Sequence, residues 1–162
     1  GGRKEPMTNN DVLRRLRYAL NLPDPLTQKI FALGGQEASA ETLAVWMKKE
    51  DEPGYIACRD EVLGAFLDGL ILKRRGPRDG EAAQGAASPM ETLDNNLVLK
   101  KLRIALELKE EDLIAILKRA DVEVSKGELS AFFRRKDHKN YKPCLDQFLR
   151  AFLGGLAEYR KP

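Results

Sequence analysis

What this sequence lacks excludes several classes of protein. No apolar run approaches the roughly 18 residues of a membrane span, and the N-terminus has no apolar stretch typical of a signal peptide. Two cysteines in a chain without an export signal indicate reduced thiols, and one histidine is too little for the usual zinc sites. We therefore expect a cytoplasmic protein with no membrane segment, no metal and no cofactor.

The composition is that of a globular protein. Of 162 residues, 43% are hydrophobic and 33% are charged, which is enough apolar surface for a packed core. The formal net charge of +3 is too small to indicate a nucleic-acid partner by itself. The length suits one ordinary domain or two very small ones.

The chain contains two copies of one unit. When the sequence is shifted by 86 positions, residues 9–22 match 95–108 and residues 55–60 match 141–146, without a gap. About 22 of about 62 aligned positions are identical, whereas unrelated sequences of average composition give about 4. The match therefore indicates an internal duplication.

Each copy is predicted to form four helices. Leu13, Leu16 and Leu20 recur at helical spacing, the Asn pairs are suited to a helix start, and Ser125-x-x-Glu128 has capping-box form. The first helices are expected from Asn9 and Asn95, the second over about 25–35 and 110–120, the third from Ser39 and Ser125 to about Lys49 and Lys136, and the fourth over apolar stripes such as 62–71. The fold class is all-α, a tandem duplication of a four-helix unit.

The domain boundaries follow from the repeat. Residues 1–6 are predicted to be a tail left by expression, 7–74 the first repeat, 75–92 a flexible linker rich in Gly, Ala and Pro, and 93–160 the second repeat. Units this small are near the lower limit for folding alone, so we expect the copies to pack together. Two independent units on a tether are the alternative.

The chain resembles the YehS-like family of small bacterial proteins. The resemblance rests on MTNNDVLRRLRYAL at residues 7–20 and on the segment from Asp137 to Leu156, which begins DHKNY and ends FLRAFLGGL. It implies a domain of unknown function that occurs twice per chain. It brings no catalytic residue and no cofactor.

The two cysteines are thiol candidates. Cys58-x-x-Glu61 and Cys144-x-x-Gln147 resemble capping boxes with sulfur in place of oxygen, and the dipole of a fourth helix would lower a thiol pKa there. A reactive thiol is one interpretation. The other interpretation, which we favour, is that each cysteine is a small buried core residue inherited with the repeat.

No pattern indicates an enzyme. His138 lacks a companion ligand or a nucleophile motif, and the acidic clusters are explained by helix starts and solvation. The glycine repeated in Phe-Leu-x-Gly-Leu is expected to allow a close helix crossing, with a ligand near the backbone as the alternative. We therefore expect a non-enzymatic protein.

Basic residues distinguish the two copies. Residues 9–71 carry 7 basic and 10 acidic side chains, a net −3, whereas residues 95–157 carry 13 and 9, a net +4. Cations at the end of a third helix complement its dipole, but those of the first helices oppose it. The candidate nucleic-acid-binding residues are Lys100, Lys101, Arg103, Arg134, Arg135, Lys136, Lys139 and Lys142, around the aromatic Tyr141.

The partner class is left open between two alternatives. We expect a binding module for a macromolecule, first another protein or a further copy of the chain, and alternatively a nucleic acid bound through the basic second copy. Residues 111–132 have some features of a helix-turn-helix, but the turn near 120–124 is several residues longer than the usual tight turn. A site is expected on the second copy or in a cleft between the two.

Overall fold

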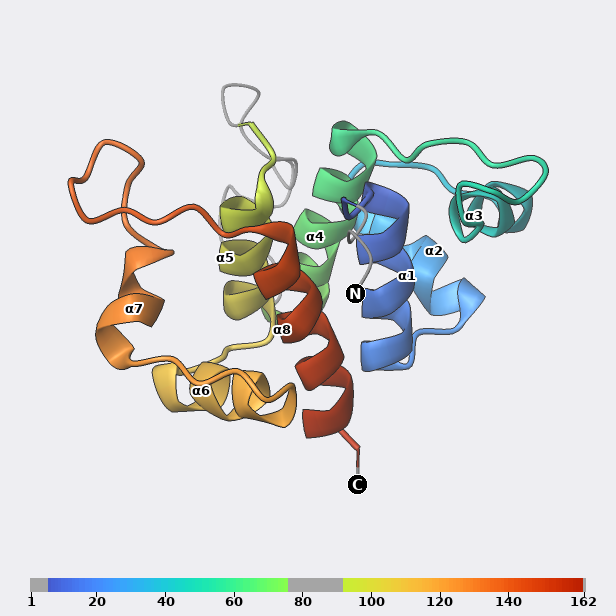
Figure 1. Cartoon of the computed structure of the whole chain (residues 1–162). Helices are drawn as coiled ribbons and strands as arrows, with labels where there is room; N and C mark the ends of the chain where they lie inside the picture. The colour runs from blue at the N-terminus through green and yellow to red at the C-terminus, as the bar shows by residue number, and fades with distance from the viewer. Residues whose placement is uncertain (1–5, 76–91, 162) are drawn as a thin grey trace.

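All regular secondary structure in the described residues is helical. The computed structural model describes residues 6–75 and 92–161, and these form eight α-helices and no strand (Figure 1). The helices are α1 Asn9–Leu20, α2 Asp24–Leu33, α3 Ala40–Trp46, α4 Asp60–Arg75, α5 Asn95–Ala105, α6 Glu110–Arg119, α7 Lys126–Ala131 and α8 Asp146–Tyr159. The predicted all-α class and the repeated four-helix unit are confirmed, because α5–α8 follow the pattern of α1–α4.

Most helix starts agree with the sequence. Ser39 and Ser125 are the N-caps of α3 and α7, and each side chain accepts a hydrogen bond from the backbone amide three residues on. The first helices differ, because Thr8 caps α1 and Asp94 caps α5. The Asn pairs lie inside the first turns and have another function, described below.

The third helix of each repeat is shorter than predicted. α3 ends at Trp46 and α7 at Ala131, several residues before the expected ends near Lys49 and Lys136. The cations after these helices therefore lie in irregular backbone. The prediction that they complement a helix dipole was wrong, since that effect is confined to the last turn.

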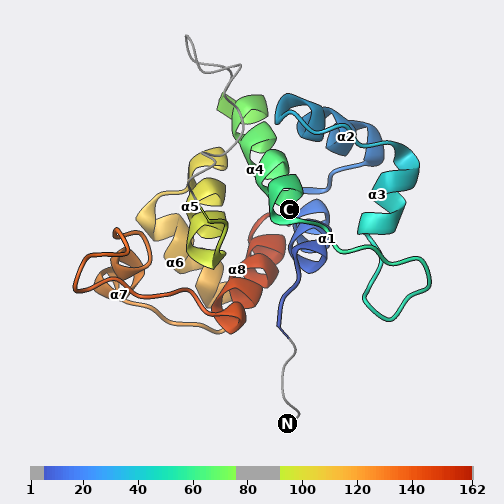
Figure 2. The same cartoon turned by 90° about the horizontal axis from the view of Figure 1, so that it is seen from above.

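The two repeats share one core. α1 packs against α8 and α4 against α5, so the principal contacts of each first helix are with the fourth helix of the other repeat. Figures 1 and 2 show α1, α4, α5 and α8 together at the centre, with α3 and α7 at opposite outer ends. Buried apolar side chains of both repeats form a single cluster. The expected packing of the copies is confirmed, and independent units are excluded.

The repeated glycine allows close helix crossings. A Cβ at Gly69 of α4 would lie 1.8 Å from the Ile30 carbonyl oxygen of α2. A Cβ at Gly155 of α8 would lie 2.1 Å from the Ile116 oxygen of α6. Both distances are far too short for atoms that are not bonded to each other, so the packing interpretation is confirmed. The partner helix occupies the space suggested for a ligand.

Polar contacts reinforce the junction between the repeats. Lys101 of α5 forms an ion pair with Asp68 of α4, and the two side chains are only 11% and 6% exposed. Arg74 Nε donates to the Ala105 carbonyl oxygen over 3.1 Å, and the Met7 amide donates to Asp146 Oδ2 over 3.1 Å. These contacts fix the register of the two repeats.

Two further expectations concern membrane segments and the predicted linker and tail. Within residues 6–75 and 92–161, no helix is long and apolar enough to cross a membrane. The predicted linker, apart from Arg75 and Thr92, and the predicted tail, apart from Pro6, lie outside the described residues.

Candidate functional site

The side chain of Asn96 fastens the irregular segment after α7 to α5. Asn96 Nδ2 donates to the carbonyl oxygens of Phe132 (3.0 Å) and Lys142 (2.9 Å), and its Oδ1 accepts from the Cys144 amide (2.8 Å). Both ends of the segment are therefore held beside the first turn of α5. Asn10 makes the equivalent three bonds in the first repeat.

The other Asn of each pair holds the start of the fourth helix. Asn95 Nδ2 donates to the Cys144 oxygen (3.0 Å) and to Asp146 Oδ1 (2.7 Å), and Asn9 repeats both contacts with Cys58 and Asp60. The sequence interpretation as helix caps missed this function. The available signal was that two adjacent Asn residues recur in both copies, although a cap needs only one.

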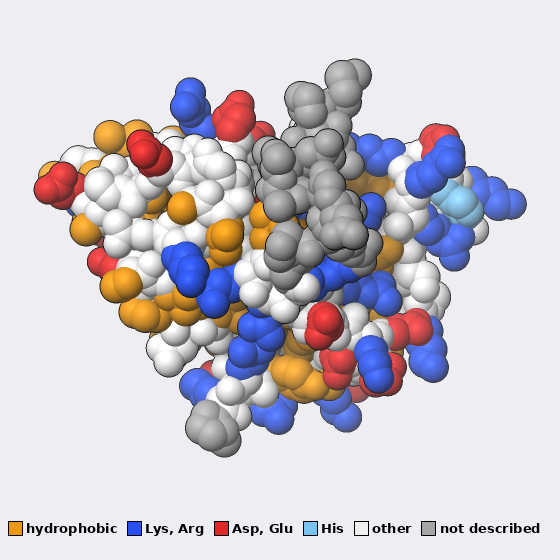
Figure 3. All heavy atoms as spheres, turned by 180° about the vertical axis from the view of Figure 1, so that it is seen from behind, with side chains coloured by type: hydrophobic (Ala, Val, Ile, Leu, Met, Phe, Trp, Pro, Cys, Tyr) orange, Lys and Arg blue, Asp and Glu red, His pale blue; other side chains and the backbone are white. Residues whose placement is uncertain are grey.

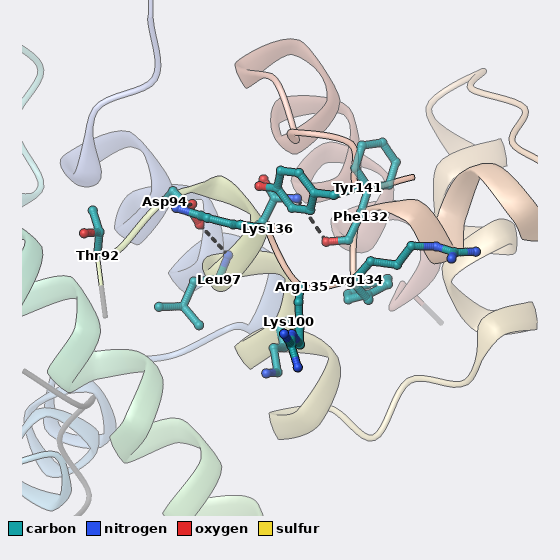
Figure 4. A pocket seen from close by; sticks show the side chains of 11 residues that line it. Thr92, Asp94, Leu97, Lys100, Phe132, Arg134, Arg135, Lys136 and Tyr141 are labelled. Carbon is teal, nitrogen blue, oxygen red and sulfur yellow. Dashed lines mark hydrogen bonds and ion pairs between the residues drawn. The ribbon is translucent and has the colours of Figure 1, made fainter. Parts of the chain in front are cut away.

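The fastened segment and α5 enclose a pocket. Its volume is about 390 Å³. Its wall consists of the N-terminal part of α5, the residues just before it, and the segment that follows α7 (Figure 4). The lining residues are Thr92, Asp94, Asn96, Leu97, Lys100, Phe132, Phe133, Arg134, Arg135, Lys136 and Tyr141. Four of the eight predicted basic residues thus line one site, although the Arg134 guanidinium points away from the other three and contacts His138 (Figure 4).

Positive charge exceeds negative charge around this pocket. Lys136 is paired with Asp94 over 2.8 Å, which raises the pKa of the Lys136 ammonium, and Arg135 is paired with Asp137 over 2.7 Å. Both are surface pairs, which water screens and which a stronger anion displaces at little cost. Lys100 has no ion pair with any residue in the described ranges. The pocket is suited to an anionic ligand.

An aromatic ring borders the same cations. Tyr141 is partly exposed and stands above Lys136 in Figure 4, and desolvation raises the pKa of its hydroxyl. The ring stays protonated and neutral at physiological pH because its ordinary pKa is already near 10. Figure 3 shows Lys and Arg side chains gathered around His138, the one histidine of the chain, at this end of the molecule.

The other four predicted basic residues do not line this pocket. Lys101 is buried in the junction with Asp68, so its assignment to a nucleic-acid surface was wrong. Arg103 donates to the Leu108 oxygen and lies 4.7 Å from the centre of the Phe133 ring. Lys142 lies over Phe132 at 5.6 Å, and Lys139 is exposed in the segment after α7.

The first repeat has a different charge at the equivalent place. Arg14 stands where the second repeat has Lys100, but it forms an ion pair with Asp11 and donates to the Met47 oxygen. Asp11 itself replaces Leu97, and Glu50 replaces Lys136. The same fold therefore presents a neutralised surface in one copy and a cationic pocket in the other.

The cysteines occupy buried equivalent positions. Leu145, not Cys144, is the N-cap of α8, and each sulfur donates to the carbonyl oxygen of the next residue, Arg59 or Leu145. Burial, followed by the nearby carboxylates of Asp60 and Asp146, raises the pKa of both thiols to about 12. The favoured interpretation as buried core residues is therefore confirmed. The alternative, a thiol pKa lowered by a helix dipole, is wrong, because desolvation and negative charge both oppose thiolate formation.

The remaining sequence candidates bring no further chemistry together. His138 is exposed, its Nδ1 accepts from the Asn140 amide over 3.0 Å, and its Nε2 lies 3.1 Å from Arg134 Nη1. No cluster of three potential metal ligands occurs in the described part of the chain. Six residues, 120–125, separate α6 from the short α7, which differs from the tight turn of a helix-turn-helix.

Comparisons with known proteins give a family but no activity. The model of the family described as "Protein of unknown function (DUF1456)" matches residues 9–76 and again residues 95–161. The chain is 50% identical over 151 residues to the "Uncharacterized protein YehS" of Escherichia coli (strain K12), covering 93% of this chain and 95% of the relative. No solved structure matches the chain.

Proposed function

Since this chain belongs to the DUF1456 family, whose description states no function, we propose that it is a non-enzymatic binding module for nucleic acid. The observation that carries the proposal is that Lys100, Arg134, Arg135 and Lys136 all line one pocket beside Tyr141. Lys and Arg side chains neutralise phosphates, and an aromatic ring offers a face on which a base stacks.

The chemistry of the pocket supports binding rather than catalysis. Asp94 is the only carboxylate among its lining residues, and its Oδ1 caps α5 while Oδ2 pairs with Lys136. A carboxylate engaged in this way is poorly placed to accept a proton from a substrate. The buried thiols are held in their protonated form, which is not the nucleophilic form.

Two paired substitutions test the proposal. Arg134→Ala combined with Arg135→Ala should weaken binding of a single-stranded oligonucleotide about tenfold or more and flatten the salt dependence, because about two phosphate contacts are lost. Lys48→Ala combined with Lys49→Ala is the matched control, since it removes the same charge from the equivalent positions of the first repeat. Fluorescence anisotropy across a salt series gives both quantities.

The expected pattern is a large loss for the second-repeat variant and less than about a threefold loss for the control. Equal losses of affinity in the two variants would indicate that the oligonucleotide binds by general charge attraction and not at the pocket. Absence of binding at about 50 mM salt would contradict the proposal. A duplex of the same sequence, measured in parallel, establishes whether unpaired bases are needed for contact with Tyr141.

A protein partner or self-association is the second candidate. A groove of about 290 Å³ lies next to Phe148 and is lined by Pro143 and Leu145, and Leu145 is 67% exposed. The exposed leucine and the apolar groove beside it provide a surface on which another polypeptide can pack. Sedimentation at rising protein concentration tests self-association, and Leu145→Ser should abolish any dimer found.

A further inference from the structure

The duplication gives this molecule two junctions of the same kind. α5 of the second repeat packs on α4 of the first, and α1 of the first packs on α8 of the second (Figure 2). The shift that aligns the repeats therefore aligns the junctions as well. Lys101 at one corresponds to Arg15 at the other, and Asp68 corresponds to Gly154. Each junction can serve as a reference for its counterpart.

At the α4–α5 junction, a carboxylate neutralises the cation of Lys101. The Lys101 ammonium contacts an Asp68 carboxylate oxygen, and both side chains are almost fully buried, at 11% and 6% exposure. Such burial of a cation requires a paired anion, because an unpaired charge in this environment is strongly unfavourable. A carboxylate is thus the group that this interface geometry accepts next to a cation of α5.

The α1–α8 junction has the cation without the carboxylate. Gly154 has no side chain, and a Cβ placed on it would have no atom within 4 Å. A pocket of about 380 Å³ occupies this place, lined by Arg14, Arg15, Tyr18, Leu153, Gly154, Ala157 and Glu158. Arg15 has no ion pair with any residue in 6–75 or 92–161 and, unlike Lys101, it is exposed, so water solvates its guanidinium in the absence of a ligand.

The other charged groups of this pocket already have partners. Arg14 is paired with Asp11, and Glu158 is paired with Lys161 over 3.0 Å. Tyr18, 71% exposed, replaces the partly buried Ile104 of the other junction and brings a hydroxyl to the pocket wall. The pocket therefore offers one available guanidinium, one hydroxyl and the apolar surfaces of Leu153 and Ala157.

We propose that the α1–α8 pocket binds a small molecule that carries a carboxylate, which takes beside Arg15 the place that Asp68 takes beside Lys101. The pocket volume lies within the range of small-molecule sites. A guanidinium matches a planar carboxylate with two parallel hydrogen bonds. Glu158 also lines this pocket and leaves it less cationic than the pocket of the second repeat. Leu153 and Ala157 offer apolar contacts to the methylene groups of an organic acid, which inorganic phosphate lacks.

A titration with succinate tests the proposal. Succinate added to the ¹⁵N-labelled protein at constant ionic strength should shift the backbone amide signals of Tyr18 and Gly154 along a saturable curve. Arg15→Gln should weaken this binding about tenfold, since it removes the charge and keeps a side chain of similar polarity. An equal titration with inorganic phosphate should bind more weakly than succinate.

Gly154 provides a matched pair of variants. Gly154→Asp adds a tethered carboxylate to the empty position, so it should remove succinate binding. Gly154→Ala adds only a methyl group to open space, and it should leave the affinity within about threefold. Circular dichroism verifies that each variant is folded, and Arg15→Gln provides the same information if Gly154→Asp does not fold.

Several results would overturn the proposal. These are no saturable shift at Tyr18 or Gly154 up to about 10 mM succinate, equal binding by Arg15→Gln or Gly154→Asp, and tighter binding of phosphate than of succinate. The proposal does not rest on the nucleic-acid function, because the two pockets share no lining residue. Each can therefore fail without the other.

Discussion

At the scale of single residues, Asn96 connects the fold to the candidate site. Its amide group donates twice and accepts once, and the three partners are backbone atoms at both ends of the segment after α7. A long irregular segment has no regular ladder to satisfy its backbone groups, so a side chain must supply those bonds. Asn has one acceptor and one two-hydrogen donor on a short stem, which suits this task.

Replacing this side chain should cost more stability than its size suggests. We expect Asn96→Ala to lower the free energy of unfolding by about 2–4 kcal/mol, because the Cys144 amide loses its partner together with two carbonyl groups. Urea denaturation followed by circular dichroism measures the change. The variant should also weaken oligonucleotide binding, since Arg134 to Lys136 lose their fixed position.

Asn140→Ala is the control for this change, because it removes the same group from an exposed position of the same segment. Its effect should stay within about 0.5 kcal/mol. A loss for Asn96→Ala no larger than that of the control would show that the segment is held by other contacts.

At the scale of helices, α8 illustrates how adjacent residues meet different environments. Gly154 faces open space, whereas a Cβ at Gly155 would lie 2.1 Å from the Ile116 oxygen of α6 and 3.3 Å from the Ile116 Cγ2. Successive residues of a helix point about 100° apart, so one faces the α1 junction and the next faces α6. Glycine weakens a helix, and the packing of α8 requires it at Gly155 but not at Gly154.

Alanine at these two positions should change stability in opposite directions. Gly154→Ala should raise the free energy of unfolding by up to about 1 kcal/mol, because alanine favours helix and meets no neighbour. Gly155→Ala should lower it by about 1–3 kcal/mol, because α6 must move away from α8. Urea denaturation of both variants checks the pair, and effects of the same sign would contradict the crossing geometry.

At the scale of the whole molecule, the cross-packing makes the repeats interdependent. α1 is covered chiefly by α8 of the other repeat, and α4 packs against α5 of the other repeat about as extensively as against α2 of its own. The buried side chains of both repeats form one cluster. Separating the repeats would expose this surface to water, which is unfavourable in proportion to its apolar area. We therefore expect one cooperative unfolding transition.

The single tryptophan makes this expectation measurable. Trp46, the last residue of α3, is buried in the first repeat with its ring centre 5.3 Å from that of Phe31, so its fluorescence reports the unfolding of that repeat. Gly155→Ala in the second repeat should lower the denaturation midpoint seen by Trp46 fluorescence by the same amount as that seen by circular dichroism. A Trp46 transition that keeps the wild-type midpoint would show that the repeats unfold separately.

The sequence by itself determined the local structure and the duplication. Apolar spacing at Leu13, Leu16 and Leu20, capping by Ser39 and Ser125, and the recurrent glycine are all short-range or repeated signals, and each led to the right element. These features depend on residues that are close to one another in sequence, so the sequence alone is sufficient to predict them. The excess of positive charge in the second repeat was visible in the same way.

Only the tertiary structure decided which of those charges act together. Lys100 and Lys101 are neighbours in sequence, yet one lines the cationic pocket and the other is buried against Asp68, because their directions on α5 differ by about 100°. The function of Asn96 depends on backbone atoms more than thirty residues away, and the pocket beside Arg15 depends on a helix from the other repeat. Such long-range placement follows from how the two copies pack, which local patterns do not encode.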